Sequence, residues 1–479
     1  MDLNKLEEWN ENDQYQNIID AIEALPDSER TPDLTSQLAR AYNNLADSGD
    51  RPLFKRAVEL LESVEEELSG EHNWNYRMGY ALYYLNQELR AEHYFKKALE
   101  YRPGDEDTLE MISMCRKVLA LPKFMKPFRQ RTAEGWQSFL EGEEGLRQLI
   151  DAKKSGSEVA DRCHELLAPA FEELYFEIGF NGSKYDLILS PDGDKSRIFK
   201  LEYFKDHAPR EVLEHWNIMV GRPPANSFVL RMYDQDIGTG DADVWVEELE
   251  DSQVGLSIYC EKLLPLLKEN EGQAYGLMAV LLDQAIGEIQ AIRYVGYMDL
   301  LEAPKEGEKI CLADLLEYMK KDREPATAEQ MCQWYCAYEM TPSEEEEWDL
   351  RQDVYAGVTS CVPMINAYYR GDDAVMEDFH KDGAVPGFFY YPLDGIPGDK
   401  ILDLRDELSD EISRICGDAV VFTGGATGAV YGYLDFIAWD LTAVLNAAAD
   451  VFKNSPVKEA LFHIFRRDVG SIWIKEEDE

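Results

Sequence analysis

The most constraining feature of this 479-residue chain is a 34-residue pattern at residues 72–105. Small residues and one aromatic residue recur there at the intervals of two antiparallel helices joined by a short turn, and a proline closes the pattern. These positions are Gly79, Ala91, Phe95, Ala98 and Pro103. One such helix pair cannot bury its apolar face alone, so the pattern predicts an array of stacked helix pairs.

Weaker copies of this pattern lie on both sides of it. Residues 112–113 follow residues 78–79 by 34 positions, which predicts a further helix at the end of the array. Upstream, the apolar positions of residues 38–61 fit another repeat, and those of residues 18–26 fit half of one. We therefore predict an α-helical solenoid over residues 1–122, with two repeats and flanking helices.

The inner side of such an array is lined by positions of the first helix of each pair. In residues 72–105 these positions are Asn73, Tyr76, Tyr80, Tyr83 and Tyr84. Tyrosine combines a rigid ring with a polar hydroxyl and is common at protein-binding surfaces, so we predict that these residues bind a protein or peptide. The alternative is that later helices of the same chain fill the groove, because aromatic residues on helices are often core residues.

The charge of the chain restricts the class of partner. Its 94 Asp and Glu residues outnumber its 48 Lys and Arg residues, which gives a formal net charge of -46 at pH 7. Such a surface repels phosphate groups, so we expect no nucleic acid and no membrane as a partner. A basic protein or peptide is the favoured partner.

Cysteine and histidine usage points to a reducing compartment and to no metal site. The eight cysteines are irregularly spaced, the seven histidines are dispersed, and the first residues show no charged-then-apolar leader. No apolar run reaches the 18 or more residues of a membrane-spanning helix. These features predict a cytoplasmic protein with reduced thiols, no metal ligands and no cofactor.

Beyond the array, helical and strand-like periods mix. The basic segment 123–131 breaks the acidic background, and we interpret it as a connector. Two α+β domains are predicted after it, at residues 132–304 and 326–479. The strands that we expect are 185–190, 197–201, 215–220, 244–249, 255–259, 387–391, 419–422 and 471–475. The helices that we expect are 133–152, 158–176, 208–214, 275–289, 328–340, one capped by Ser343 with acidic residues 344–347 in its first turn, 400–415 and 440–451.

A second candidate site lies near the end of the chain. A glycine-rich stretch follows a predicted strand, and a group of chemically capable side chains follows it. The residues are Gly424, Gly425, Thr427, Gly428, Asp435, His463, Arg466 and Arg467. The glycines can present backbone N–H groups to a phosphate, Asp435 and His463 can form an acid-base couple, and an arginine can hold an anion. The simpler interpretation, which we favour, is a structural glycine turn beside buried ion pairs, with no catalytic residue.

The N-terminal stretch, in which residues 72–105 carry the clearest spacing, resembles tetratricopeptide-repeat (TPR) proteins, and the resemblance covers about a quarter of the chain. It implies a helical superhelix that binds proteins or peptides. The groove is expected to offer tyrosines in place of the Lys and Asn side chains with which this family holds a peptide carboxylate. From Trp136 onward, the blocks at residues 187–194, 215–217, 282–288 and 424–428 resemble those of uncharacterised bacterial proteins.

These observations favour an adaptor or scaffold that acts through its repeats, and they do not favour an enzyme. A narrower version is an immunity-type binder that captures a basic toxin, for which the acidic charge is suited. The alternative function is an enzyme or small-ligand sensor that uses the cluster at residues 424–468.

Overall fold

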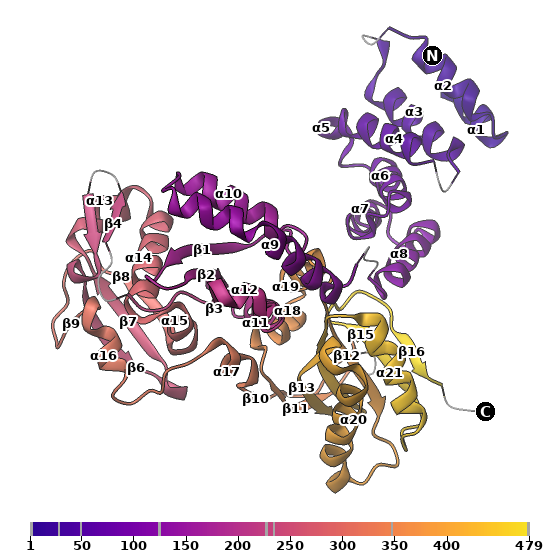
Figure 1. The fold of residues 1–479 in the computed structure, drawn as a ribbon. Coiled ribbons are helices and arrows are strands. Elements are labelled where there is room, and N and C mark those ends of the chain that lie inside the picture. Colours follow the sequence, from indigo (N-terminus) through magenta and orange to yellow (C-terminus); the bar gives the residue numbers. More distant parts are fainter. Residues whose placement is uncertain are drawn as a thin grey trace. The chain divides into compact units, whose positions relative to one another are not determined.

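The computed structural model describes residues 3–26, 29–47, 50–122, 126–225, 229–232, 235–345 and 348–476 (Figure 1). The chain forms two compact units, which we describe separately. The N-terminal unit comprises Met1–Lys123 and Asp468–Ile472, and the C-terminal unit comprises Phe124–Arg467 and Trp473–Glu479. Our predictions for residues 123–125 of the connector and for residues 346–347 of the Ser343 helix lie outside the described residues.

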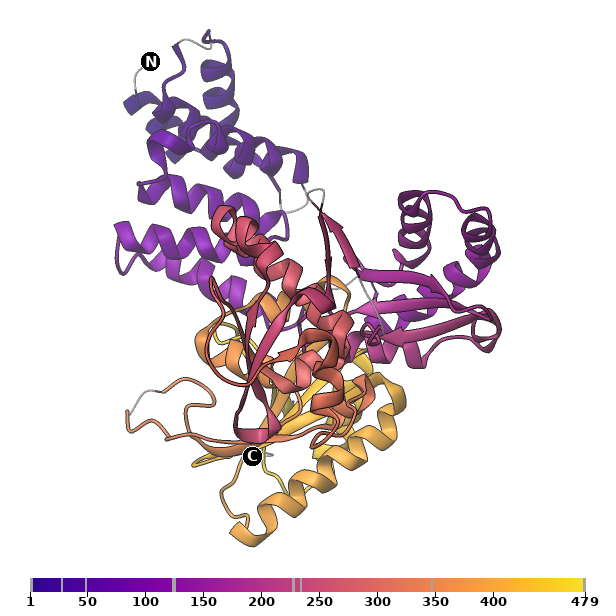
Figure 2. The same cartoon turned by 90° about the vertical axis from the view of Figure 1, so that its left-hand side faces the viewer.

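The N-terminal unit is built from helices. They are α1 (Leu3–Glu11), α2 (Tyr15–Glu23), α3 (Pro32–Leu45), α4 (Arg51–Glu62), α5 (Glu65–Leu68), α6 (His72–Tyr84), α7 (Glu88–Tyr101) and α8 (Glu106–Leu119). Side-chain caps begin two of them, because Thr31 accepts a hydrogen bond from the Leu34 N–H and Asp105 from the Thr108 N–H. Figure 2 shows the helices following one another through the unit, from indigo to purple.

Close helix packing in this unit depends on a small residue in α6. A Cβ atom at Gly79 would lie 2.8 Å from the Phe95 ring of α7, so only glycine leaves room for that ring. Phe95 is fully buried in the core of the unit. The expected small residue in the first helix and the aromatic residue in the second therefore pack against each other.

The last part of the chain contributes a short segment to the same unit. The Asp468 carboxylate lies 2.7 Å from the Lys96 ammonium of α7, and the Gly470 N–H donates to the Arg116 carbonyl oxygen of α8. Asp468–Ile472 thus adds to the surface of the last two helices of the unit.

The C-terminal unit mixes helices and strands, as an α+β fold does. Its helices are α9 (Phe128–Asp151), α10 (Gly156–Leu167), α11 (Arg197–Asp206), α12 (Arg210–His215), α13 (Leu264–Glu269), α14 (Glu271–Ile286), α15 (Glu288–Tyr294), α16 (Leu315–Met319), α17 (Ala328–Gln333), α18 (Val362–Arg370), α19 (Ala374–Lys381), α20 (Ile401–Cys416) and α21 (Leu441–Lys453). Its strands are β1 (Tyr175–Phe180), β2 (Tyr185–Ser190), β3 (Trp216–Val220), β4 (Val229–Met232), β5 (Gln235–Gly238), β6 (Asp243–Glu248), β7 (Val254–Tyr259), β8 (Val295–Leu300), β9 (Ile310–Cys311), β10 (Cys336–Glu339), β11 (Val354–Thr359), β12 (Val385–Pro392), β13 (Val420–Gly428), β14 (Tyr431–Ala438), β15 (Ala460–Ile464) and β16 (Ile472–Lys475). The expectation of mixed helix and sheet is confirmed.

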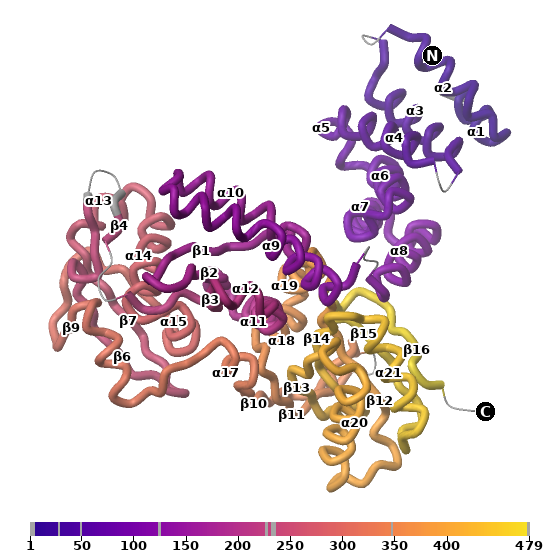
Figure 3. Tube along the Cα trace, viewed as in Figure 1, coloured from indigo at the N-terminus to yellow at the C-terminus, as the bar shows by residue number. Residues whose placement is uncertain are grey.

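These strands form several sheets. The order is β1-β2-β3 in one, β8-β7-β6-β9 in a second and β10-β11-β13-β14-β12-β15-β16 in the largest, while β4 and β5 form a separate pair. The tube in Figure 3 shows the chain leaving the β6–β9 region through α16 and α17 before it enters the largest sheet at its edge strand β10.

Both faces of the largest sheet are covered, as alternate side chains of β12 show. The Phe388 ring lies 5.9 Å from the Tyr368 ring of α18, on one face. The next residue, Phe389, lies 5.6 Å from the Phe452 ring of α21, on the other. Burial on both faces explains why β12 is a continuous apolar run with no alternation.

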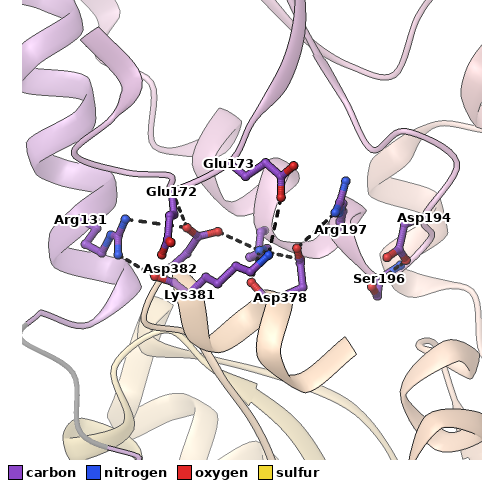
Figure 4. Close-up of polar contacts among 10 residues, drawn as sticks. Arg131, Glu172, Glu173, Asp194, Ser196, Arg197, Asp378, Lys381 and Asp382 are labelled. Carbon is purple, nitrogen blue, oxygen red and sulfur yellow. Dashed lines mark hydrogen bonds and ion pairs between the residues drawn. The ribbon is translucent and has the colours of Figure 1, made fainter. Parts of the chain in front are cut away.

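A buried ion network within the C-terminal unit joins α9, α11 and the segment before β1 to the end of α19 (Figure 4). The Lys200 ammonium of α11 lies 2.7 Å from the Asp378 carboxylate and 2.8 Å from the Asp382 carboxylate. Asp382 also accepts a hydrogen bond from the Glu172 N–H and faces the guanidinium of Arg131 at 3.7 Å. The Lys200 and Asp382 side chains are only 5% and 3% exposed, so neither charge is screened by water and each depends on the other.

One expected strand is a helix. Residues 197–201 lie in α11, which begins after the Asp194 carboxylate accepts a hydrogen bond from the Ser196 N–H. Seven consecutive residues of α11, 198–204, are buried, so its sequence carries no amphipathic period. The prediction failed because a helix buried all round and a buried strand look alike in sequence.

Two expected helices are too long. The helix predicted at residues 158–176 is replaced by α10 and the start of β1, and the one at 328–340 is replaced by the six-residue α17 and by β10. Residues 336–339 form a strand and not a helix because β10 pairs with β11, and the sheet supplies the backbone hydrogen bonds that a helix would otherwise make. No helix begins at Ser343 within the described part, residues 341–345.

The helix expected at 275–289 is interrupted at Gly287, whose φ of +92° separates α14 from α15. The remaining expected elements are present with shifted ends, apart from the strand at 419–422. It is longer than expected and is described with the glycine-rich stretch below. No described helix is long and apolar enough to cross a membrane.

Candidate functional site

An aromatic stripe runs along α6. His72, Tyr76, Tyr80 and Tyr84 follow one another every four residues, so their rings lie on one side of the helix. Ring centroids are 6.0 Å apart for the first pair, 6.3 Å for the second and 4.9 Å for the third. The stripe ends on Phe54 of α4, whose ring stacks on Tyr84 at 4.9 Å.

A hollow of about 400 Å³ lies beside this stripe. Its wall comes from α1, α3, α6, α8 and the connection between α7 and α8. The lining residues are Glu7, Arg40, Asn43, Asn44, His72, Asn73, Tyr76, Arg77, Tyr80, Arg102, Asp105 and Asp107. The stacking of successive helices therefore produces one polar hollow with aromatic side chains along α6.

The structure brings three of the five predicted binding residues to this hollow. Asn73, Tyr76 and Tyr80 line it, while Tyr83 and Tyr84 do not. Tyr84 packs instead on Phe54, in the contact between α4 and α6. Helical geometry explains this division, since residues 83 and 84 lie further toward the end of α6.

The lining is richer in arginine and asparagine than we expected. Arg40, Asn43 and Asn44 come from α3 and were not predicted as site residues. No local sequence pattern marks them, because the packing of α3 on α6 brings them to this wall. Asn43, in the last turn of α3, donates to the carbonyl oxygen of Arg77 in the middle of α6.

Two of the arginines in the hollow are neutralised locally. Arg40 pairs with Glu7 at 2.9 Å, and Arg102 pairs with Asp105 at 3.3 Å. Asp105 also lies 3.4 Å from the His72 ring nitrogen Nε2. These contacts hold side chains from separate helices in fixed positions around the hollow.

Arg77 differs from them. Its guanidinium donates to the Ser36 hydroxyl at 2.7 Å and to the Gln37 side-chain oxygen at 3.4 Å, and no carboxylate pairs with it among the described residues. Burial lowers the pKa of Arg77 to about 10, with a further contribution from Arg40, so the group stays cationic at neutral pH. The hollow therefore contains a half-buried positive charge that a carboxylate of a ligand can neutralise.

The tyrosines act as neutral hydrogen-bonding groups. Burial raises the pKa of Tyr76 to about 12, and burial together with a hydrogen bond to Tyr84 raises the pKa of Tyr80 further. Both hydroxyls keep their protons at physiological pH and can donate as well as accept.

The glycine-rich stretch is not a turn. Residues 424–428 lie inside β13, between β11 and β14. Gly424 has φ +145°, and a side chain there would collide with the Val358 carbonyl of β11. Gly428 packs against the Asp353 carboxylate in the same way. Glycine is needed here for close approach of neighbouring strands, and the paired backbone is not free to bind phosphate.

Asp435 is paired with a residue that we did not predict. Arg351 reaches it with two hydrogen bonds, of 2.6 Å and 3.1 Å, and both side chains are fully buried. Burial opposes the charge on Arg351, yet the carboxylate of Asp435 raises the pKa of Arg351 well above its usual value. The guanidinium also lies 4.9 Å from the ring centroids of Phe388 and Tyr433.

Asp435 and His463 do not form a couple. Phe388 of β12 lies opposite Asp435 on one side and opposite His463 on the other, so two strand spacings, about 10 Å, separate them. The His463 ring stacks on Phe388 at 5.2 Å, and its Nδ1 lies near the Ile464 carbonyl oxygen. The acid-base geometry that we considered from the sequence is therefore not formed.

The two arginines beyond β15 point to different carboxylates. Arg466 lies 3.3 Å from Asp373, and Arg467 pairs with Asp349. Asp435 thus lies in a buried ion pair, as the simpler interpretation of the sequence proposed. The partner of Arg466 is partly exposed, and the pair of Arg467 is exposed on both sides.

Within the described residues no group of three or more His, Cys, Asp or Glu side chains is arranged to hold a metal ion. Comparison with protein-family models, with curated proteins and with solved structures found no match to this chain.

Proposed function

We propose that the N-terminal unit is a TPR-like array whose hollow binds a peptide segment of a partner protein, so that the chain acts as an adaptor. The observation that carries this proposal is the hollow itself. Side chains of four helices and of one helix connection surround it, as expected of a peptide groove in stacked helix pairs.

Hydrogen bonds between the helices of this unit support the stacked arrangement. Asn44 donates to the Asn10 side chain, Asn43 to the Arg77 carbonyl oxygen, and Arg51 to the Leu85 carbonyl oxygen, in each case across 34 residues. Asn10 and Asn44 lie in the last turns of α1 and α3, whereas Arg77 lies in the middle of α6 and Leu85 just after it. These contacts therefore tie neighbouring helices together, and they do not mark equivalent repeat positions.

The chemistry of the hollow suits a peptide with both polar and aromatic contacts. Tyr76 and Tyr80 offer ring faces, and Arg77 offers a cation. The net charge of -46 favours a partner that is basic elsewhere, since the field of the whole chain steers it at long range. An immunity-type binder for a basic toxin is the narrower form of this proposal and rests on that charge alone.

The test is selection of peptides from a random displayed library against the full-length protein. A selected peptide is then titrated by fluorescence anisotropy with the wild type and with Tyr80→Ala, Asn73→Ala and Tyr101→Ala. Tyr80 and Asn73 line the hollow, whereas Tyr101 is an exposed tyrosine of the same unit outside it.

We expect Tyr80→Ala to weaken binding about 30-fold, as for an interface hot spot, and Tyr101→Ala to leave it unchanged. Asn73 is exposed, so a weaker affinity of the Asn73→Ala variant for the peptide would not be caused by unfolding. Equal affinity for all four proteins, or a library that yields no binding peptide, would refute the proposal.

A further inference from the structure

The C-terminal unit contains a cavity of about 900 Å³ that takes no part in the proposed peptide binding. Its wall includes the edge strand β10, the helices α15, α17 and α18, the loop before α11 and the turn before β7. A volume of this size is at the upper end of those that hold small organic molecules.

Three cations line this cavity without being neutralised. They are Lys195 before α11, Arg293 on α15 and Arg370 at the end of α18. Across the part of the chain that the structure describes, none of the three has an ion pair or a side-chain hydrogen bond. Most other basic side chains of this unit are paired with carboxylates, as Lys200 and Arg351 are.

The balance of charge in the cavity is opposite to that of the chain. The whole sequence has 94 acidic and 48 basic residues, whereas the cavity wall has three cations and two carboxylates, Asp251 and Asp372. Asp372 accepts a hydrogen bond from the Ala374 N–H, at the start of α19. A local excess of cations within an acidic protein creates a place where an anion is stabilised.

Arg293 is held in position by an aromatic residue. Its guanidinium carbon lies 3.8 Å from the ring centroid of Trp334, and its Nε–H is buried without an acceptor. A guanidinium stacked on an indole keeps its N–H groups at the edge of the stack, where they can reach a carboxylate or phosphate. A buried N–H without an acceptor costs free energy until a ligand supplies one.

The cavity also offers flat apolar surface. Trp334 and Tyr335 are 47% and 50% exposed, which is unusual for such large rings. Val362, Asn366 and Arg370 follow one another every four residues on α18, so one side of this helix carries an apolar group, an amide and a cation along the wall.

We propose that this cavity binds a small organic anion that combines a flat ring with a phosphate or carboxylate group. The anionic group contacts Arg293, Lys195 and Arg370, and the ring lies against Trp334 and Tyr335. This binding is independent of the peptide groove in the N-terminal unit, and either proposal can fail alone.

The experiment is isothermal titration calorimetry of the full-length protein with four defined probes. Adenosine 5′-monophosphate tests a phosphate joined to a ring, and 1-naphthoate tests a carboxylate joined to a ring. Adenosine and inorganic phosphate test separately the two parts of adenosine 5′-monophosphate. The variants are Arg293→Met and Arg370→Ala, with Arg414→Ala as control, because Arg414 is an exposed arginine of α20 outside the cavity.

We expect one or both ring anions to bind with a stoichiometry of one and more tightly than either separate part. Each cavity variant should weaken that binding about tenfold or more, since a charge-assisted contact is lost, while Arg414→Ala leaves it unchanged. Arg370 is exposed and has no partner among the described residues, so its replacement does not disturb the fold. The relative affinity of the two ring anions identifies phosphate or carboxylate as the preferred group.

Absence of binding of both ring anions at millimolar concentration would overturn the proposal. Binding that is the same in wild type, Arg293→Met and Arg370→Ala would overturn it as well, because the anion would then lie elsewhere.

Discussion

A carboxylate at the end of α14 is expected to make the stability of the C-terminal unit depend on pH. Burial raises the pKa of Asp283 to about 7 from an ordinary value of 3.8, and the nearby Glu288 adds to this shift. Glu288 is fully buried and accepts hydrogen bonds from the Ser190 hydroxyl and the Arg222 N–H. Arg222 lies 3.3 Å from Asp283 but is shared with Glu288, so it does not cancel the repulsion.

The sign of the effect follows from where the proton is held. Between the two pKa values the folded chain keeps the proton of Asp283 and the unfolded chain has released it. Rising pH therefore favours the unfolded chain, with a limiting slope of about 1.4 kcal/mol per pH unit. Between pH 5 and pH 8 the free energy of unfolding should fall by about 2–3 kcal/mol through this group alone.

The perturbation is Asp283→Asn, which resembles the protonated carboxyl in shape and has no charge to titrate. Urea-induced unfolding of wild type and variant is followed at several pH values from 5 to 8. The histidines also titrate in this range but are common to both proteins, so the difference between the two curves isolates Asp283. Glu271→Gln, at the exposed start of the same helix, is the matched control.

We expect the variant to gain stability relative to wild type as the pH rises, and the control to show no such gain. Parallel curves for wild type and Asp283→Asn would show that the carboxyl is already ionised at pH 5. Burial and the sharing of Arg222 with Glu288 would then not raise the pKa of Asp283.

Two further predictions concern packing and charge inside the units. Lys200→Met should destabilise the protein by about 3 kcal/mol or more, because it leaves the buried Asp382 and the largely buried Asp378 without their ammonium. Lys381→Met, at an exposed ion pair, should cost less than about 1 kcal/mol in the same urea titration. Gly79→Ala should lower the free energy of unfolding by about 1–3 kcal/mol, because the added Cβ collides with the Phe95 ring. Gly145→Ala should raise the free energy of unfolding by about 0.5–1 kcal/mol, because Gly145 lies in open space on α9 and alanine favours the helix. Equal effects of the two members of either pair would contradict the described packing.

Part of the site could be predicted from the sequence because it depends on local spacing. Gly79 and Phe95 face each other across one helix pair, and Asn73, Tyr76 and Tyr80 follow from the same helical period. The partners of those residues in the hollow were missed. Arg40 and Asn44 lie on another helix, and only the stacking of α3 on α6 brings them to the same wall.

The sequence by itself determined that helices and strands are mixed beyond the first unit, and it identified the small residue that lets α6 and α7 approach. These features depend on residues a few positions apart, where side-chain geometry along one helix or strand is fixed. The acidic charge is equally a property of composition alone.

Only the tertiary structure decided what the polar residues do. Asp435 is 84 residues from Arg351, and nothing local distinguishes that arginine from the other basic residues of the chain. The stretch 424–428 has the glycine content of a turn, yet pairing with β11 and β14 makes it a central strand. Burial and pairing between distant segments set the role of a charge or a glycine, and they arise only when the sheets and helices assemble.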